Sequence, residues 1–469
     1  MQFPLPIAHA LEGKADLPIP EWLFAWAASL VLLVSFVVLT LAWKRARFED
    51  ADWRPFKAGL ARALVNPVTA GLAGALGAFL LGAIIWSGLF GTEAPDRNFS
   101  LTFVFVTCWV GIPVASAFAG DVFRAFNPWR AIARVAASGF RLIAGQAPPP
   151  PLRYPERWGR WPAVLGIVGF TWLELVFAQS GFQAIGLTPH TVAIAALAYT
   201  GLTFVGMALF GIDEWLDRGE AFSVFFNMFS RLASLEVRDG RLGRRRWLSG
   251  AVGWAAVPGS VALVLVSIGT TAFDGAGEGL LQEPIADTFD WLYDSVGVGA
   301  IWSLRLANSL FFVLTIAAVS AIFWAGIAGM RTVRTSTGSF SAGELGRLFG
   351  HSFIPIALAY LVAHYFSLFV FQEQAQFTYL LSDPLGDGSD YFGTAAAGID
   401  YKLVGATLVW YVQVAALVIG HVIALVLAHD RALTAYGEVR AAARSQYWML
   451  AMMVGFTTLG LFLLSFANQ

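Results

Sequence analysis

Residues 410–432 read WYVQVAALVIGHVIALVLAHDRA, an apolar run long enough to cross a lipid bilayer as one helix. Small residues recur at every fourth position of this run, at Ala416, Gly420, Ala424 and Ala428. Such a stripe lets a second helix approach closely inside a membrane. His421 directly follows Gly420 of this stripe. Because an unpaired polar group in hydrocarbon costs several kcal/mol, we expect this imidazole to face a neighbouring helix and not lipid.

The composition of the 469-residue chain predicts a membrane protein. Hydrophobic residues make up 57% of the chain and charged residues only 13%, and the mean hydropathy is +0.66, far from the values of soluble domains. Apolar runs of about 20 residues or more lie near residues 21–43, 67–91, 101–120, 161–182, 191–211, 250–271, 299–327, 352–372, 403–427 and 447–466. We therefore predict an all-α, polytopic integral membrane bundle of about ten transmembrane helices over residues 21–469, after an extracytoplasmic tail over residues 1–20.

The basic residues orient these spans. Of the 30 Lys and Arg residues, 26 lie in alternate connections, at 44–66, 121–160, 212–249, 328–351 and 428–446. Loops on the cytoplasmic side of a membrane carry such an excess. The connection at 272–298 holds six acidic residues and no basic one. We therefore predict that both termini lie outside the cytoplasm.

Two cytoplasmic connections predict short helices at the membrane surface, near residues 127–145 and 220–235. In the first, Asn127 and Pro128 suit a helix N-cap and first turn, and arginines are set among apolar residues. The second has an aromatic face followed by a basic end. We expect both helices to lie in the interface plane against anionic lipid. Membrane lipids are thus the expected partners, and we predict no nucleic-acid binding.

Polar residues within the spans are the candidates for function, because they are rare there and by default mark paths for ions, protons or substrates. The candidate binding residues are Glu174, Arg305, Asn308, Tyr360, His364, Gln413 and His421. A helical rise of about 1.5 Å per residue places Glu174, His364 and Gln413 near the middle of the membrane. We expect a polar cavity between the fourth, seventh, eighth and ninth spans.

Two questions about these residues remain open. Glu174 and Arg305 could neutralise each other as a buried pair, or Glu174 could titrate and exchange protons. His364 could line a cavity together with Tyr360, which lies four residues earlier on the same helix face. It could instead be a core histidine that is hydrogen-bonded to a neighbouring helix.

Metal and cofactor content is left undetermined. Cys108 is the only cysteine, and no HxH, HxxxH or HExxH spacing occurs. His9 in the tail is a lone candidate copper ligand. A haem held by His364 and His421 would require strong tilt, because their depths differ by roughly 9 Å of helical rise. No GxSxG or Walker-type motif is present.

Several short segments carry a family resemblance. They are His9 and residues 16–20 (DLPIP), 126–130 (FNPWR), 382–386 (SDPLG), 392–394 (FGT), 420–421 (GH) and 428–432 (AHDRA). With these segments the chain resembles a group of bacterial, largely actinobacterial, polytopic membrane proteins that are often labelled fenitrothion hydrolase. The resemblance implies the bacterial cytoplasmic membrane and hydrolysis of an organophosphate triester. His9, His190, Asp274 and Asp383 would then form the pool of residues that could activate a water at the outer face.

Three functions are consistent with these observations. The first is binding or translocation of a small solute or ion through the intramembrane polar cavity. The second is hydrolysis by a membrane-embedded enzyme. The third is a non-catalytic membrane subunit, which would bind a redox or secreted enzyme, or a second copy of the chain, through its outer loops.

Overall fold

The computed structural model of the chain describes residues 21–49, 52–57, 59–178, 187–277, 279–333 and 339–467. Ten helical segments in this part of the chain are long and apolar enough to cross a membrane. They are Leu23–Ala42, Pro67–Phe90, Phe99–Ala119, Glu156–Phe177, Pro189–Phe210, Ser260–Gly277, Ala300–Met330, Ala342–Ser382, Ala406–Tyr436 and Val439–Leu463. The predicted polytopic all-α bundle is therefore confirmed, and the protein is a multi-pass membrane protein.

Most spans centre on one helix. These helices are α1 (Glu21–Ala42), α3 (Pro67–Phe90), α9 (Pro189–Phe210), α12 (Ser260–Gly277), α14 (Ala300–Met330), α16 (Ile354–Phe377), α18 (Ala406–Tyr436) and α19 (Val439–Ala467). The third span joins α4 (Phe99–Thr102), η3 (Phe103–Gly111) and α5 (Ile112–Ala119), and the fourth joins α8 (Trp161–Trp172) and η5 (Leu173–Phe177). Both η3 and η5 are π-helical, a conformation that is frequent at functional sites.

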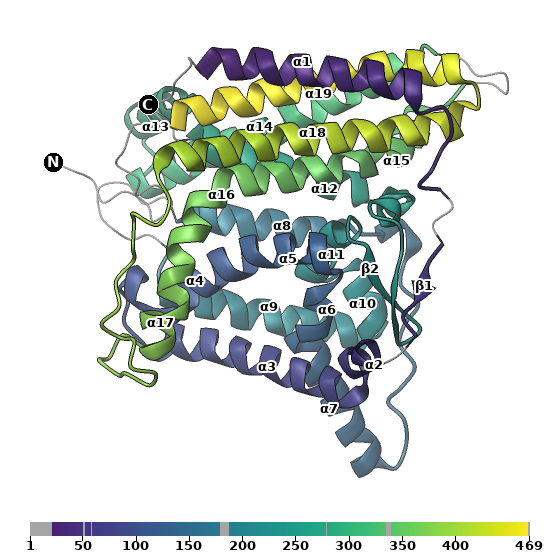
Figure 1. Cartoon of the computed structure of the whole chain (residues 1–469). Helices are drawn as coiled ribbons and strands as arrows, with labels where there is room; N and C mark the ends of the chain where they lie inside the picture. The colour runs from purple at the N-terminus through teal and green to yellow at the C-terminus, as the bar shows by residue number, and fades with distance from the viewer. Residues whose placement is uncertain are drawn as a thin grey trace.

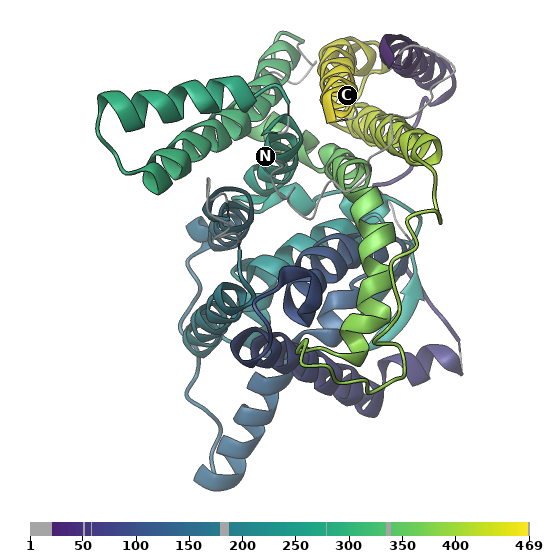
Figure 2. The same ribbon diagram turned by 90° about the vertical axis from the view of Figure 1, so that its left-hand side faces the viewer.

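The spans run roughly parallel to one another across Figure 1. α1 and α19 lie side by side in both views, and α18 packs against both (Figures 1 and 2). α1 begins and α19 ends at the same end of the bundle, as an even number of spans requires (Figure 1). The opposite end carries the basic connections, which predict that it faces the cytoplasm.

A small sheet and a projecting helix occupy this basic end (Figure 1). The strands β1 (Arg54–Pro55), β2 (Leu235–Arg238) and β3 (Arg241–Arg244) form an antiparallel sheet in the order β1–β3–β2, which we did not predict. The projecting helix is α7 (Pro128–Ala144). The Asn127 side chain caps α7 as predicted, because it accepts a 2.8 Å hydrogen bond from the backbone N–H of Arg130.

The second predicted surface helix differs from its prediction. It is α11 (Ala221–Ser230), and its residues Phe225, Phe226 and Phe229 are fully buried. The helix packs against α5 and α8. The prediction that α11 lies on the membrane surface is therefore wrong, because its aromatic face completes the core of the protein.

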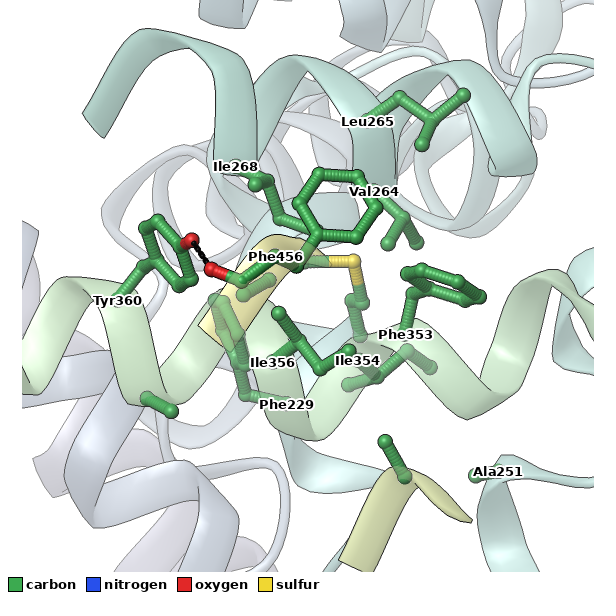
Figure 3. Close-up of a cluster of buried hydrophobic side chains, with 14 of the residues drawn as sticks. Phe229, Ala251, Val264, Leu265, Ile268, Phe353, Ile354, Ile356, Tyr360 and Phe456 are labelled. Carbon is green, nitrogen blue, oxygen red and sulfur yellow. Dashed lines mark hydrogen bonds between the residues drawn. The ribbon is translucent and has the colours of Figure 1, made fainter. Parts of the chain in front are cut away.

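The small-residue stripe of α18 lies against α16, as predicted. A Cβ atom at Gly420 would lie 2.3 Å from the Cβ of Ala359 and 2.8 Å from the carbonyl oxygen of Pro355, so a larger residue cannot fit without movement. Apolar side chains from α12, α16 and α19 form a buried cluster nearby (Figure 3). Within it the Tyr360 hydroxyl donates a 2.6 Å hydrogen bond to the Phe456 carbonyl oxygen, which joins α16 to α19 (Figure 3).

Asp430, near the basic end of α18, anchors the segment that follows α1. Its carboxylate accepts hydrogen bonds from Trp43 Nε1 at 2.8 Å, the Arg47 amide at 2.7 Å and the Phe48 amide at 3.1 Å. The next residue, Arg431, donates to both carboxylate oxygens of Glu49 at 2.6 and 2.7 Å. The first and ninth spans are therefore tied together at this end.

The sixth span lies further along the chain than we predicted. Helix α12 starts at Ser260, directly after Pro258 and Gly259, whereas we predicted a span over residues 250–271. Gly259 has φ +84°, which is not helical, and the proline lacks a backbone N–H. Because α12 continues to Gly277, Asp274 lies within the span and not in the outer connection to which we assigned it.

Candidate functional site

Asp274 on α12 and two successive residues of α16 form a polar centre inside the bundle. Oδ2 of Asp274 lies 2.7 Å from Nε2 of His364 and accepts a 2.7 Å hydrogen bond from the Tyr365 hydroxyl. The His364 and Asp274 side chains are only 9% and 16% exposed, and Tyr365 is buried. A carboxylate and an imidazole at this distance can share a proton or form an ion pair, and either state reduces the cost of burying charge.

A small cavity adjoins this centre, between α12, α16, α18 and α19. Its volume is about 30 Å³, and its wall includes Thr271 and Gly275 from α12 and Tyr360 and His364 from α16. One water needs roughly 10–15 Å³ of such space, so about two waters fit. Pockets for organic ligands usually measure several hundred Å³. The cavity therefore suits water or a small ion.

Glu174 approaches the same centre from the fourth span. It belongs to the π-helical segment η5, and its charge interacts with Asp274 and with Tyr365. Its Oε2 atom is buried and has no hydrogen-bond partner among the residues that the structure describes.

Arg305 and Asn308 on α14 make local contacts instead. The Arg305 guanidinium lies 4.0 Å from the centroid of the Phe177 ring and donates a long hydrogen bond of 3.5 Å to the Phe177 carbonyl oxygen. Within the described ranges it forms no ion pair with Glu174, although we considered that pairing. Asn308 donates a 2.9 Å hydrogen bond to a carbonyl oxygen of its own helix.

His421 and Gln413 on α18 are both buried, and His421 lies close to the cavity. Nδ1 of His421 lies 2.7 Å from the Leu417 carbonyl oxygen, and its ring centroid is 6.2 Å from that of Tyr360. Leu417 and Tyr360 both line the cavity. Gln413 lies one helical turn before Leu417, and its Oε1 atom has no partner in the described part of the chain.

Tyr365 is the member of the centre that we did not select from the sequence, and Asp274 was selected only as a residue of the outer face. Asp274 was counted with the acidic outer connection, because we ended the sixth span at residue 271. The Pro258–Gly259 pair could have corrected this error, since a span that begins at Ser260 must reach about residue 277 to cross the membrane. Tyr365 directly follows His364, but adjacent helical residues point about 100° apart and usually face different neighbours.

The residues that would serve hydrolysis at the outer face lie on separate elements. His9 falls outside the described residues, and His190 is exposed at the start of α9. Asp383 accepts two backbone N–H hydrogen bonds within the connection after α17 (Tyr379–Ser382). Asp274 is buried beside His364. Across the described ranges, no three or more His, Cys, Asp and Glu side chains are grouped so that they could hold a metal ion.

The fold and this centre define a class: a multi-pass α-helical membrane protein with a buried carboxylate–imidazole pair beside a water-sized cavity. Comparison with known proteins adds no family to this description. No family model, no curated protein and no solved structure matches the chain.

Proposed function

We propose that the protein translocates protons across the bacterial cytoplasmic membrane through the Asp274–His364 centre. One observation carries the proposal: a carboxylate and an imidazole lie 2.7 Å apart within the bundle, beside a cavity that fits water. Chains of Asp, Glu and His in membrane spans are typical of proton pumps and transporters. Here His364 would pass a proton between Asp274 and the water of the cavity.

The size of the cavity favours a proton over an organic solute. A volume of about 30 Å³ leaves room for about two waters, which can hydrogen-bond to His364 and carry a proton. Glu174 supports the same conclusion, because it is a further ionisable group whose charge acts on Asp274, and ionisable groups within spans are typical of proton paths.

Proton flux in reconstituted vesicles tests the proposal. Purified protein is placed in liposomes that contain a pH-sensitive dye, and a potassium diffusion potential of either sign is imposed with valinomycin. We expect the internal pH to change faster than in protein-free vesicles. The Asp274→Asn variant should lower the rate by roughly a hundredfold or more, which is the usual contribution of an essential proton-transfer group.

A matched carboxylate provides the control. Asp294 is exposed on the outer connection in η8 (Trp291–Ser295), so Asp294→Asn should keep the wild-type rate. Size-exclusion profiles of both variants report on folding. An Asp274→Asn protein that folds and conducts at the wild-type rate would refute the proposal, as would a wild-type rate equal to that of empty vesicles under both potentials.

A second candidate is hydrolysis of an organophosphate ester, which the label of the resembling group implies. The Asp274–His364 pair favours this candidate, because an Asp and the imidazole that it orients are two of the three members of a hydrolytic triad, and the adjoining cavity fits a water. Release of a nitrophenol from a phosphotriester by purified protein in detergent tests this candidate. Product formation that Asp274→Asn abolishes would support hydrolysis, whereas no release above the protein-free rate would reject it.

A further inference from the structure

The seam between α16 and α18 carries buried histidines on the basic side of the cavity. His421 is fully buried on α18, and its Nδ1 lies 2.7 Å from the Leu417 carbonyl oxygen. A carbonyl oxygen only accepts, so Nδ1 carries the hydrogen and Nε2 of the neutral ring is left with a lone pair. Nε2 has no hydrogen-bond partner in the part of the chain that the structure describes. The lone pair on Nε2 is therefore the position at which this ring would take up a proton.

His351 is the next histidine toward the basic end. It lies in η9 (Gly350–Phe353), the turn that precedes α16 and packs against α18, and only 1% of it is exposed. Neither of its ring nitrogens makes a hydrogen bond of normal geometry within the described ranges.

The positions of these rings form a sequence from the centre to the basic end. Tyr360 lies one helical turn from His364 and lines the same cavity, and its ring centroid is 6.2 Å from that of His421. The neighbouring Gly420 contacts Pro355 and Ala359, so His421 lies at a level between Tyr360 and His351. The thirteen residues from His351 to His364 span roughly 20 Å of helical rise. Two imidazoles therefore divide the distance that a proton would travel.

We propose that His421 and His351 form the cytoplasmic leg of the proton path, with Tyr360 between the cavity and His421. This inference rests on the proposed function. Each imidazole accepts a proton at an unpartnered nitrogen and releases it to the next water or ring, so no bond other than N–H and O–H forms or breaks. Leaving a buried polar atom unpaired costs about 1–3 kcal/mol. Because both histidines bear that cost, a role in the fold alone does not account for them.

The flux assay tests this path with histidine variants. His421→Gln and His351→Gln keep similar side-chain size but cannot carry a proton, and we expect each to lower the Asp274-dependent flux by roughly tenfold or more. His190→Gln is the matched control, because His190 is exposed at the outer end of the bundle, and it should keep the wild-type flux. Thermal stability in detergent separates a structural role, since a variant that loses flux but melts at the wild-type temperature has not lost it through unfolding.

The possible results separate a failure of this path from a failure of the proposed proton translocation. If either variant folds and keeps the wild-type flux while Asp274→Asn abolishes it, the path along this seam is refuted and the proposed function stands. If the wild type shows no flux, both fail. If His421→Gln does not fold, we would use His421→Leu, because leucine fills the site without any polar atom. Wild-type flux in His421→Leu would also refute the inference.

Discussion

Replacing Gly275 by alanine should close the cavity and leave the fold intact. Gly275 is buried in the interior of α12 and lines the cavity. A Cβ atom at this position would lie 3.5 Å from Nδ1 and 3.7 Å from Cε1 of His364, which is ordinary van der Waals contact. The methyl group would therefore occupy the space that water needs beside the imidazole, and no atom would have to move.

We expect the Gly275→Ala variant to be more stable than the wild type but to conduct protons more slowly. Alanine favours the interior of a helix over glycine by about 1 kcal/mol, so the free energy of unfolding should rise by up to that amount. A methyl group takes about the place of one water, and the cavity of about 30 Å³ holds about two. One hydrogen-bonded step of the proton path is lost, and at about 1–3 kcal/mol this predicts a fall in flux of roughly fivefold to 150-fold.

Proton flux in vesicles and thermal unfolding in detergent, measured on the same preparation, test the expected loss of flux and the expected gain in stability. The control is Gly277→Ala, since a Cβ at Gly277 meets no atom within 4 Å and should gain helix stability without touching the cavity. A loss of flux with unchanged or higher stability cannot come from unfolding. If Gly275→Ala is stabilised and keeps the wild-type flux, the cavity does not carry the proton and our reasoning is refuted.

Two further predictions concern the basic end of the bundle. Asp430→Ala removes the acceptor of three hydrogen bonds from residues 43–48 and should lower the free energy of unfolding by roughly 3 kcal/mol or more, measured by thermal unfolding, whereas Asp294→Ala should have little effect. Burial raises the pKa of the Glu220 carboxyl, although hydrogen bonds from its neighbours lower it in part. Its contribution to stability is therefore full below the pKa of an unfolded glutamate, about 4.3, and is lost as the pH rises through the higher folded pKa. Melting temperatures should fall for the wild type as the pH rises above about 4.3 and should fall less for Glu220→Gln, which keeps an oxygen to cap α11; parallel curves would contradict this assignment.

The number of spans could be predicted because a bilayer imposes a length on every apolar run. The ends of the spans were harder to predict, since apolar residues continue beyond the membrane wherever protein covers them. The peptide before Ser260 is an example: Ala251 and Trp254 are buried, so the apolar run starts before the helix does. The aromatic face of α11 misled us for the same reason, because apolar residues that face protein and apolar residues that face lipid have the same composition.

The partners of the polar residues could not be predicted from single spans. Rarity alone was enough to select His364, Tyr360 and Glu174. Which neighbours they meet depends on the rotation of each helix, and a helix that is apolar on every face gives no signal of that rotation. Arg305 therefore seemed an equal partner for Glu174, whereas in the structure the Arg305 guanidinium lies over the Phe177 ring.

Stability alone does not explain the polar residues along the α16–α18 seam. At Gly420 the two backbones come so close that one added methyl group would collide with Ala359. Close packing of this kind holds helices together in lipid, and apolar side chains along the rest of the seam would add to it. His421 instead buries a nitrogen that has no partner among the described residues, although an apolar side chain of similar size would avoid the cost of about 1–3 kcal/mol. We expect a polar side chain to be kept at a position where it weakens the fold if it acts on an ion, proton or solute that crosses the membrane.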